Sequence, residues 1–254
     1  MPGAPRRLLQ ALLRAALPGA CALCGAACDG ALCGPCRTQF FRQPEARCPR
    51  CANPVAPAKN RGQVCHSDTS PAVETLCGAC LRQPPAFDAT VVACDYALPL
   101  DQLVLQLKFG HRLALAPLLA ELLRDAVLQR PALVLPALLC PVPLGAQRLT
   151  ERGFNQALEI ARPLARALGV PLYPRLAARV HETLAQSSVA PAERRANIAH
   201  AFTLSDAALV AGRHVGIVDD VMTSGQTLNE LAATLKRYGA ARVSNLVFAR
   251  TPPH

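Results

Sequence analysis

Asp219 and Asp220 are adjacent carboxylates at the end of a short apolar run. Such acids accept hydrogen bonds from the neighbouring hydroxyl groups of a ribose. A loop rich in hydroxyl groups follows them, and a helix-forming run, Leu228 to Tyr238, follows the loop. Backbone N–H groups at a helix start bind phosphate, and the helix dipole favours negative charge there. The order predicts a ribose-phosphate site, and the alternative is an ordinary strand-to-helix turn. The loop residues are Val221, Met222, Thr223, Ser224, Gly225, Gln226 and Thr227.

The cysteines predict metal binding. Of the 12 cysteines, ten lie between residues 21 and 80, and eight of these form four Cys-x-x-Cys pairs. Each pair can supply two thiolates to a tetrahedral ion, so the four pairs predict two structural Cys₄ zinc sites. Redox-active pairs are the alternative. The spacing leaves open whether the pairs combine sequentially or interleave. The eight expected ligands are Cys21, Cys24, Cys33, Cys36, Cys48, Cys51, Cys77 and Cys80.

Three further groups lie among these pairs. Cys28 falls inside the short first loop and is expected to be a spare thiol. Cys65 and His66 lie in a polar insertion between ligand pairs, where they are either substitute ligands or exposed side chains.

The charge of the chain favours anionic partners. The formal net charge is +10, from 27 Lys and Arg against 17 Asp and Glu, which suits phosphorylated metabolites or nucleic acid alike. Aromatic residues make up only 4% and Trp is absent, so stacking on bases is not an obvious binding mode. Arg14 interrupts the apolar core of residues 6–17 and cysteines follow at once, which argues against a signal peptide. The leucines of this segment form one apolar helical stripe, which favours a docked amphipathic helix over a membrane anchor. We therefore expect a cytoplasmic protein without membrane insertion.

The order of elements predicts three parts. Residues 1–20 are expected to form an N-terminal amphipathic helix, residues 21–85 a double zinc ribbon, and residues 86–254 an α/β domain. Within the last part, strand-like runs at 90–96 and 133–143 alternate with helical runs at 100–109, 114–128 and up to 168. This alternation predicts a parallel sheet with helices on both faces. Ligands of such sheets bind at the carboxyl ends of strands, where the 140–156 and 219–227 segments would lie.

Several motifs along the chain resemble those of one family. The segment from Asp219 to Thr227 resembles the loop of type I phosphoribosyltransferases that binds phosphoribosyl pyrophosphate (PRPP). With the four cysteine pairs, the chain is identified as a member of the ComF family of competence-associated proteins. The other motifs are Pro84-Pro85-x-Phe87-Asp88, Leu107-Lys108-Phe109, Pro141-Val142-Pro143, Arg152-Gly153-Phe154-Asn155-Gln156, Arg179-x-x-x-Thr183-x-x-Gln186, Arg195-x-Asn197 and Ala201-Phe202. Cys140 and the insertion around Cys65 depart from the family pattern.

The resemblance implies a type I phosphoribosyltransferase fold, with a flexible flap and a hood, behind the double zinc ribbon. It implies that Asp219 and Asp220 bind the ribose hydroxyls and that residues 223–227 hold the 5-phosphate. Arg148 and Arg152 are the candidates for pyrophosphate contacts, and Mg²⁺ is expected with PRPP. Asp219, Asp220 and Arg152 are the expected catalytic residues. Residues 172–201 are either the flap or an exposed charged loop, and Lys108 and His111 are either ligand contacts or a solvated edge.

Two functions follow from the resemblance. The first is transfer of phosphoribose from PRPP, or a related ribose-5-phosphate ligand, to an acceptor that the sequence does not identify. The second is a non-catalytic protein of DNA uptake that binds single-stranded DNA or acts as a scaffold or sensor through the same fold. A competence helicase or recombination protein is the partner that the family's role implies.

Overall fold

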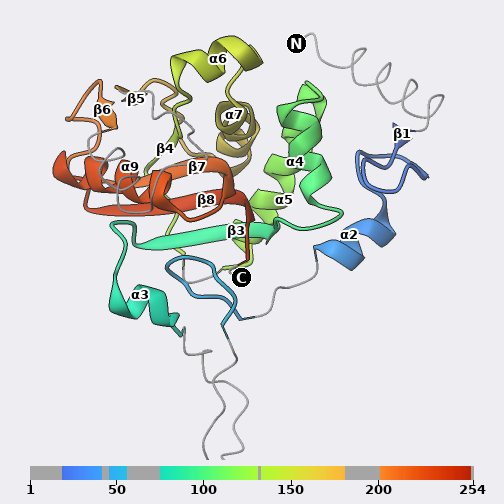
Figure 1. Cartoon of the computed structure of the whole chain (residues 1–254), viewed down its shortest axis with the longest axis horizontal. Coiled ribbons are helices and arrows are strands. Elements are labelled where there is room, and N and C mark those ends of the chain that lie inside the picture. The colour runs from blue at the N-terminus through green and yellow to red at the C-terminus, as the bar shows by residue number, and fades with distance from the viewer. Residues whose placement is uncertain (1–18, 42–45, 56–74, 131–132, 181–200, 253–254) are drawn as a thin grey trace, which may run out of the picture.

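The computed structural model describes residues 19–41, 46–55, 75–130, 133–180 and 201–252 (Figure 1). The helix expected in residues 1–20 lies outside them except for its last two residues, as do Cys65, His66 and the flap residues Thr183, Gln186, Arg194, Arg195, Asn197 and His200. The elements of the α/β part are β3 (Ala89–Asp95), α4 (Asp101–Lys108), a 3₁₀ turn (Leu113–Leu115), α5 (Ala116–Leu128), β4 (Leu138–Pro141), α6 (Ala146–Arg152), α7 (Gln156–Leu168), β5 (Ala177–Arg179), β6 (Phe202–Leu204), β7 (His214–Met222), α9 (Gln226–Arg237) and β8 (Arg242–Arg250).

The central sheet confirms the predicted fold class. Its four strands lie in the order β3-β8-β7-β4, and every neighbouring pair is parallel. The register pairs Ile217 of β7 with Asn245 of β8, and Asp219 with Val247. The carboxyl ends of β7, β8, β3 and β4 therefore lie at one edge of the sheet, as in other open parallel sheets whose ligands bind at that edge.

Helices cover both faces of the sheet, as predicted. Because side chains alternate along a strand, Ile217 joins a core cluster that contains the apolar side of α9, and Val218 joins a second cluster with α4, α5 and α7. Figure 1 shows α9 on the side of the sheet away from α4 and α5. Both strand residues are fully buried, which explains why residues 215–218 of β7 read as a short apolar run.

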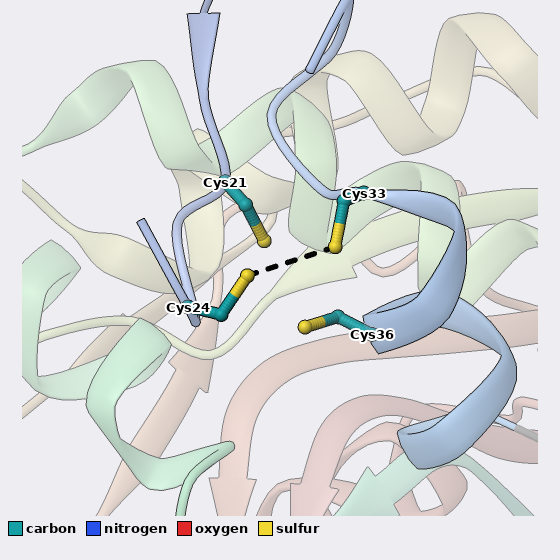
Figure 2. A group of neighbouring side chains, drawn as sticks. All are labelled: Cys21, Cys24, Cys33 and Cys36. Atoms are coloured by element: carbon teal, nitrogen blue, oxygen red, sulfur yellow. Dashed lines mark hydrogen bonds between the residues drawn. The ribbon is translucent and has the colours of Figure 1, made fainter. Parts of the chain in front are cut away.

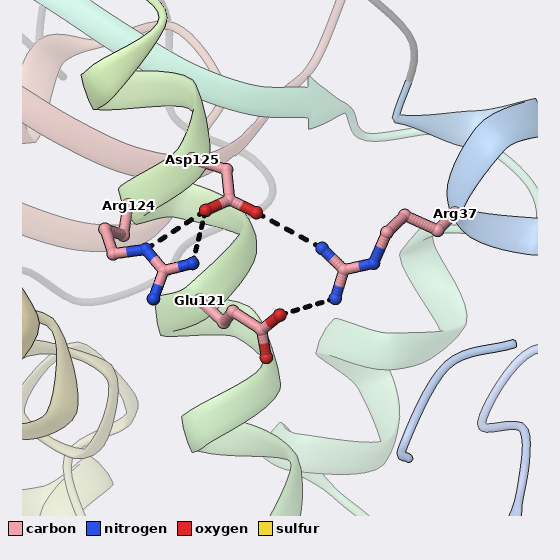
Figure 3. A network of polar contacts seen from close by, with 4 residues as sticks. All are labelled: Arg37, Glu121, Arg124 and Asp125. Carbon is pink, nitrogen blue, oxygen red and sulfur yellow. Dashed lines mark hydrogen bonds and ion pairs between the residues drawn. The ribbon is translucent and has the colours of Figure 1, made fainter. Parts of the chain in front are cut away.

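The first cysteine-rich unit consists of a two-stranded hairpin, β1 (Gly19–Ala20) with β2 (Ala27–Cys28), and the helix α2 (Gly34–Phe40). Apolar residues of this unit, including Phe40 and Phe41, pack on the cluster that contains α4 and α5. Figure 3 shows that Arg37 of α2 also reaches two carboxylates of α5, Glu121 at 2.6 Å and Asp125 at 3.2 Å. The first unit is thus docked on the α5 side of the domain.

The second cysteine-rich unit, residues 46–55 with α3 (Gly78–Arg82), packs on the other core cluster, which contains α9. It also covers the edge strand β3: Thr90 donates its backbone N–H to the carbonyl of Pro49 at 3.0 Å and its hydroxyl to that of Arg50 at 2.6 Å. Pairing of this kind protects an edge strand from other chains.

Two elements differ from the expectation. The strand predicted at 133–143 is shorter, since β4 covers only Leu138–Pro141; Pro136, which has no N–H to donate to a ladder, precedes it. The segment after β4, expected as a loop, contains the helix α6. Gly145 precedes this helix, and Gly153 ends it with φ 74, the left-handed conformation that glycine adopts without strain. Both signals were present in the sequence.

Candidate functional site

The two predicted carboxylates lie near the carboxyl end of β7. The side chain of Asp219 accepts a hydrogen bond from the backbone N–H of Asp220 at 2.9 Å, and Asp220 accepts one from Val221 at 2.8 Å. These local bonds orient the carboxylates at the end of the strand. Thr223 and Ser224, which follow, are exposed and open to a ligand.

The loop leads directly into α9. Gly225 occupies the position before the helix with φ 79, and a Cβ atom there would lie 2.4 Å from the Cε atom of Met222. Only glycine fits this turn without strain. No side chain caps the start of α9, although Gln226 donates its N–H to the Ser224 hydroxyl at 3.4 Å. The helix start therefore presents backbone donors and a positive dipole end to an anion.

Lys108, at the end of α4, pairs with one of the two acids. Its Nζ atom lies 2.8 Å from Oδ2 of Asp220, and the two side chains are only 20% and 9% exposed. The sequence left Lys108 as either a ligand contact or a solvated edge; the structure places it against the acidic pair. Lys108 and Asp220 are far apart in the sequence, so local spacing could not predict their contact. The one sequence signal for Lys108 was its place in a family motif.

Burial and the Asp220 carboxylate both act on Asp219. Burial of Asp219, together with the nearby Asp220 carboxylate, raises the pKa of Asp219 to about 8, while Lys108 opposes the shift. A carboxyl with this pKa is largely protonated near neutral pH in the unliganded protein. Strongly shifted acids of this kind are typical of functional sites.

Arg179 lies within electrostatic range of both Asp219 and Arg148. Burial and the charge of Arg148 lower the pKa of Arg179, and the carboxylate of Asp219 raises it. Arg179 ends β5 and its guanidinium lies 5.1 Å from the ring centre of Phe202 in β6. The sequence placed Arg179 in residues 172–201, either a flap over the site or an exposed charged loop, whereas Arg148 was a predicted pyrophosphate contact and is exposed.

Arg152, the other predicted pyrophosphate contact, stacks on an aromatic ring. Its guanidinium carbon lies 5.4 Å from the ring centre of Phe109, which directly follows Lys108 and is 63% exposed. His111 and Phe154 meet edge to face nearby, with ring centres 5.8 Å apart. The motifs at 107–109 and 152–156 therefore meet in space, beside Asp220.

The rest of the 152–156 motif shapes the backbone. Asn155 caps α7 by accepting the N–H of Leu158 at 3.3 Å, and it donates to the carbonyl of Val142 at 3.0 Å. Gln156 is buried in the first turn of α7. These contacts fix the segment that follows β4 against the helix, and so position Arg152.

Each group of four cysteines brings its sulfur atoms together. Cys21, Cys24, Cys33 and Cys36 form one group and Cys48, Cys51, Cys77 and Cys80 the other, with all four ligand atoms of a group within 4.8 Å of one another. The sequential pairing, which spacing left open, is the one that the structure shows. Cys28 lies outside the first group and donates to the carbonyl of Gly30 instead.

The sulfur geometry fits zinc. The Sγ atoms of Cys24 and Cys33 are 3.7 Å apart and those of Cys51 and Cys77 are 3.5 Å apart. Four sulfurs at the usual zinc–sulfur distance in a tetrahedron are about 3.8 Å apart. Figure 2 shows the four side chains of the first group pointing toward a common centre.

Backbone donors favour a thiolate at one cysteine of each group, whereas burial raises the pKa of Cys36 and Cys80. Burial raises the pKa of Cys21, but N–H groups of Cys33, Cys24 and Leu23 outweigh it and bring the pKa to about 6. The same balance brings the pKa of Cys48 to about 7. Thiolates are the form that binds zinc.

Comparison with known proteins gives the chain's relatives. The family model described as phosphoribosyl transferase domain matches residues 155–253. The DNA utilization protein YhgH of Salmonella typhimurium is 36% identical over 241 residues, which covers 92% of this chain and 98% of that protein. Competence protein F of Haemophilus influenzae is 36% identical over 179 residues, 68% of this chain and 78% of that protein.

Solved structures with a matching part include an allosteric regulatory enzyme of purine biosynthesis, at 17% identity and a TM-score of 0.36 over 52% of this chain and 26% of that one. A hypoxanthine phosphoribosyl transferase of Trypanosoma cruzi matches at 19% identity and a TM-score of 0.31, over 52% of this chain and 60% of that one. Among the described residues, no helix has the length and apolar character needed to cross a bilayer.

Proposed function

The chain belongs to the ComF family, and on that premise we propose that it binds PRPP with Mg²⁺ at the carboxyl edge of its sheet. One observation carries this proposal. The Asp219 and Asp220 carboxylates and the uncapped start of α9 belong to one strand–loop–helix unit, with Thr223 and Ser224 exposed between them. A ribose 5-phosphate needs acceptors for its hydroxyls and donors for its phosphate in that order.

Each group has a role in this proposal. Asp219 and Asp220 accept hydrogen bonds from the ribose hydroxyls, and residues 223–227 donate backbone and hydroxyl hydrogens to the 5-phosphate. Arg148 and Arg152 face the pyrophosphate. Lys108 and Arg179 join them because of their positions beside the two acids. Bound Mg²⁺ would supply further positive charge to the pyrophosphate oxygens.

For a transfer reaction, the residues act by position and charge. Departure of pyrophosphate from the anomeric carbon leaves positive charge on the ribose and negative charge on the leaving group. Asp219 and Asp220 then lie beside the ribose, and Arg152 stabilises the leaving group. The acceptor is not identified.

The proposal is tested with parts of the ligand. Thermal unfolding of zinc-loaded protein is followed with PRPP, ribose 5-phosphate and inorganic pyrophosphate, each with and without Mg²⁺. Saturating PRPP with Mg²⁺ stabilises by about 3 kcal/mol at a hundredfold excess over Kd, which raises the midpoint by roughly 5–10 °C. We expect Asp219→Asn/Asp220→Asn to lose this shift and Asp88→Asn, at the opposite edge of the sheet, to keep it. No shift in the wild type would refute the proposal.

In the cell we place this activity in the cytoplasm and in DNA utilization, because relatives carry the names DNA utilization protein and competence protein. A DNA helicase or recombination protein is the partner that fits this role.

A second function, binding of single-stranded DNA, is favoured by one observation. Phe109 is 63% exposed between Lys108 and the guanidinium of Arg152, and a base can stack on such a ring beside two cations. Phe109→Ala should then weaken binding of an oligonucleotide, and affinity should fall steeply with salt. Binding that is insensitive to both changes contradicts this function.

A further inference from the structure

Arg250, the last residue of β8, joins the second cysteine group to the loop that follows β7. Its Nε atom donates to the carbonyl of Cys51 at 3.3 Å. Its Nη1 atom donates to the carbonyls of Met222 at 2.9 Å and Thr251 at 2.8 Å, and also to that of Thr223. One side chain therefore touches both a candidate zinc ligand and the first residues of the proposed phosphate loop.

The position of Arg250 is unusual for a charged side chain. Only 6% of the residue is exposed, and burial lowers the pKa of its guanidinium. The four acceptors of its hydrogen bonds are all backbone carbonyls. Burial of a charge is costly unless its donors are satisfied, so these carbonyls must be held in place. The planar guanidinium, with its fixed donors, is suited to such convergent acceptors.

The carbonyl of Cys51 is held by the turn around the second cysteine group. The backbone N–H of Cys48 donates to the carbonyl of Asn53 at 2.8 Å, and the backbone N–H of Ala52 donates to the carbonyl of Cys48 at 2.9 Å. Two cysteines of this turn, Cys48 and Cys51, share their group with Cys77 and Cys80 of another segment. Zinc would fix the two segments together, because ligands of a small metal site are ordered by the ion.

A cleft of about 480 Å³ is lined by residues of both the second cysteine group and the loop. Cys51 and Cys80 line it from the cysteine group and Ser224, Gly225 and Gln226 from the loop, and Arg250 lines it as well. The two parts share a buried apolar cluster, and the hydrogen bonds of Arg250 add a direct polar link between them.

The first cysteine group has a different neighbourhood. Its unit is held to α5 through Arg37 and packs on the α4–α5 cluster. The second group packs in the cluster that contains Met222 and Leu228 of the loop and α9. The two groups should therefore differ in their effect on the loop.

We propose that Arg250 is a positioning residue that couples zinc at the second cysteine group to the conformation of the phosphate loop. Zinc at this group fixes the Cys51 carbonyl, Arg250 transmits that position to Met222 and Thr223, and the loop is held ready for a phosphate. Zinc at the first group stabilises the chain without this link. The consequence for ligand binding rests on the proposed function, whereas the consequence for the loop does not.

The test compares three variants. Arg250→Lys keeps the charge but cannot reach the separate carbonyls, Cys77→Ser opens the second group, and Cys24→Ser opens the first as a matched control. Zinc content, circular dichroism, calorimetric binding of PRPP with Mg²⁺ and hydrogen exchange of the 222–227 segment are measured for each. We expect Arg250→Lys to retain two zinc ions and its fold, yet to bind about tenfold more weakly, as loss of one or two hydrogen bonds predicts.

A double variant separates coupling from general damage. If Arg250 transmits the effect of zinc, Cys77→Ser and Arg250→Lys together should weaken binding little more than the stronger single variant. Cys24→Ser should bind PRPP as the wild type does. Equal losses in Cys24→Ser and Cys77→Ser, or wild-type affinity in Arg250→Lys, would overturn the inference.

Hydrogen exchange decides the inference even without a ligand. Faster exchange of the 222–227 segment in Arg250→Lys and Cys77→Ser than in Cys24→Ser supports it, and equal exchange in all three overturns it. If the wild type binds no PRPP, the proposed function fails, while this comparison still tests the coupling.

Discussion

Replacement of Lys108 by methionine is expected to destabilise the protein because it leaves Asp220 without its cation. The ion pair joins atoms 2.8 Å apart, with side chains 20% and 9% exposed. Two unit charges at that distance attract by about 6 kcal/mol at an effective dielectric constant near 20. Desolvation offsets part of this attraction, and removal of one partner from a buried pair costs about 3–5 kcal/mol. Because Lys108 is partly exposed, we take the lower end, about 3 kcal/mol.

This loss is measurable as a thermal midpoint. For a chain of this size, about 3 kcal/mol corresponds to a fall of roughly 6–12 °C. The matched control is Lys236→Met, whose ion pair with Asp88 has the same length of 2.8 Å but side chains 34% and 31% exposed. An exposed pair is worth about 0–1 kcal/mol, so the control should change the midpoint by only a few degrees.

The pH dependence identifies the cause. Asp219 lies beside Asp220, and burial and the Asp220 carboxylate raise the pKa of Asp219 to about 8, so Asp219 adds its negative charge to the site mainly above this value. The effect of Lys108→Met should therefore be larger near pH 9 than near pH 6, and Asp220→Asn should remove most of it. A fall no larger than that of Lys236→Met, or a fall that is independent of pH, would refute the reasoning.

Three further predictions concern the loop, the acids and the first cysteine unit. Gly225→Ala should lower the thermal midpoint and PRPP affinity, since it adds left-handed backbone strain of about 1–2 kcal/mol and a clash with Met222. The control is Gly212→Ala, where φ is 67 and no atom lies near the added Cβ; it should lower the midpoint through backbone strain alone and keep PRPP affinity. Burial and the neighbouring carboxylate raise the pKa of Asp219 from 3.8 to about 8. PRPP affinity should therefore rise as pH increases toward 8 and level off above it, while the stability of the unliganded protein falls between these two pKa values; a flat calorimetric profile contradicts this. Arg37→Gln should cost at most about 1 kcal/mol in thermal unfolding, because its ion pairs are partly exposed, and a loss of PRPP affinity would be unexpected.

The sequence was sufficient where a feature is local. The acids, the loop and the start of α9 are contiguous, so their order predicted a strand–loop–helix unit, and the structure contains one. The parallel sheet and its helices on both faces followed from the alternation of apolar strands and helical runs, and they are confirmed. The ligand roles of these residues remain predictions.

Contacts between distant segments could not be predicted in this way. The pairing of Lys108 with Asp220, and the approach of Arg179 to Asp219, depend on where α4 and β5 lie against the carboxyl edge of the sheet. Spacing alone does not report such positions. The same holds for the cysteine groups: their members were predictable from four short pairs, but their sequential pairing and their separate docking sites come from tertiary packing.

The hydrogen bonds of Arg250 could not be predicted from the sequence either. An arginine at the end of an apolar strand could equally be a solvated terminus, and only the burial of its guanidinium among carbonyls reveals its contacts. The helix α6 was predictable in principle, because Gly145 and Gly153 bracket it, but the expectation of a ligand loop in that segment outweighed this local signal.

The most direct test of the central claim is calorimetric titration of PRPP into the zinc-loaded protein, with and without Mg²⁺, beside Asp219→Asn/Asp220→Asn. We predict saturable binding to one site per chain that needs Mg²⁺ and is lost in the double variant. An absence of binding heat in the wild type, or binding that the double variant retains, would contradict a PRPP site at the carboxyl end of β7.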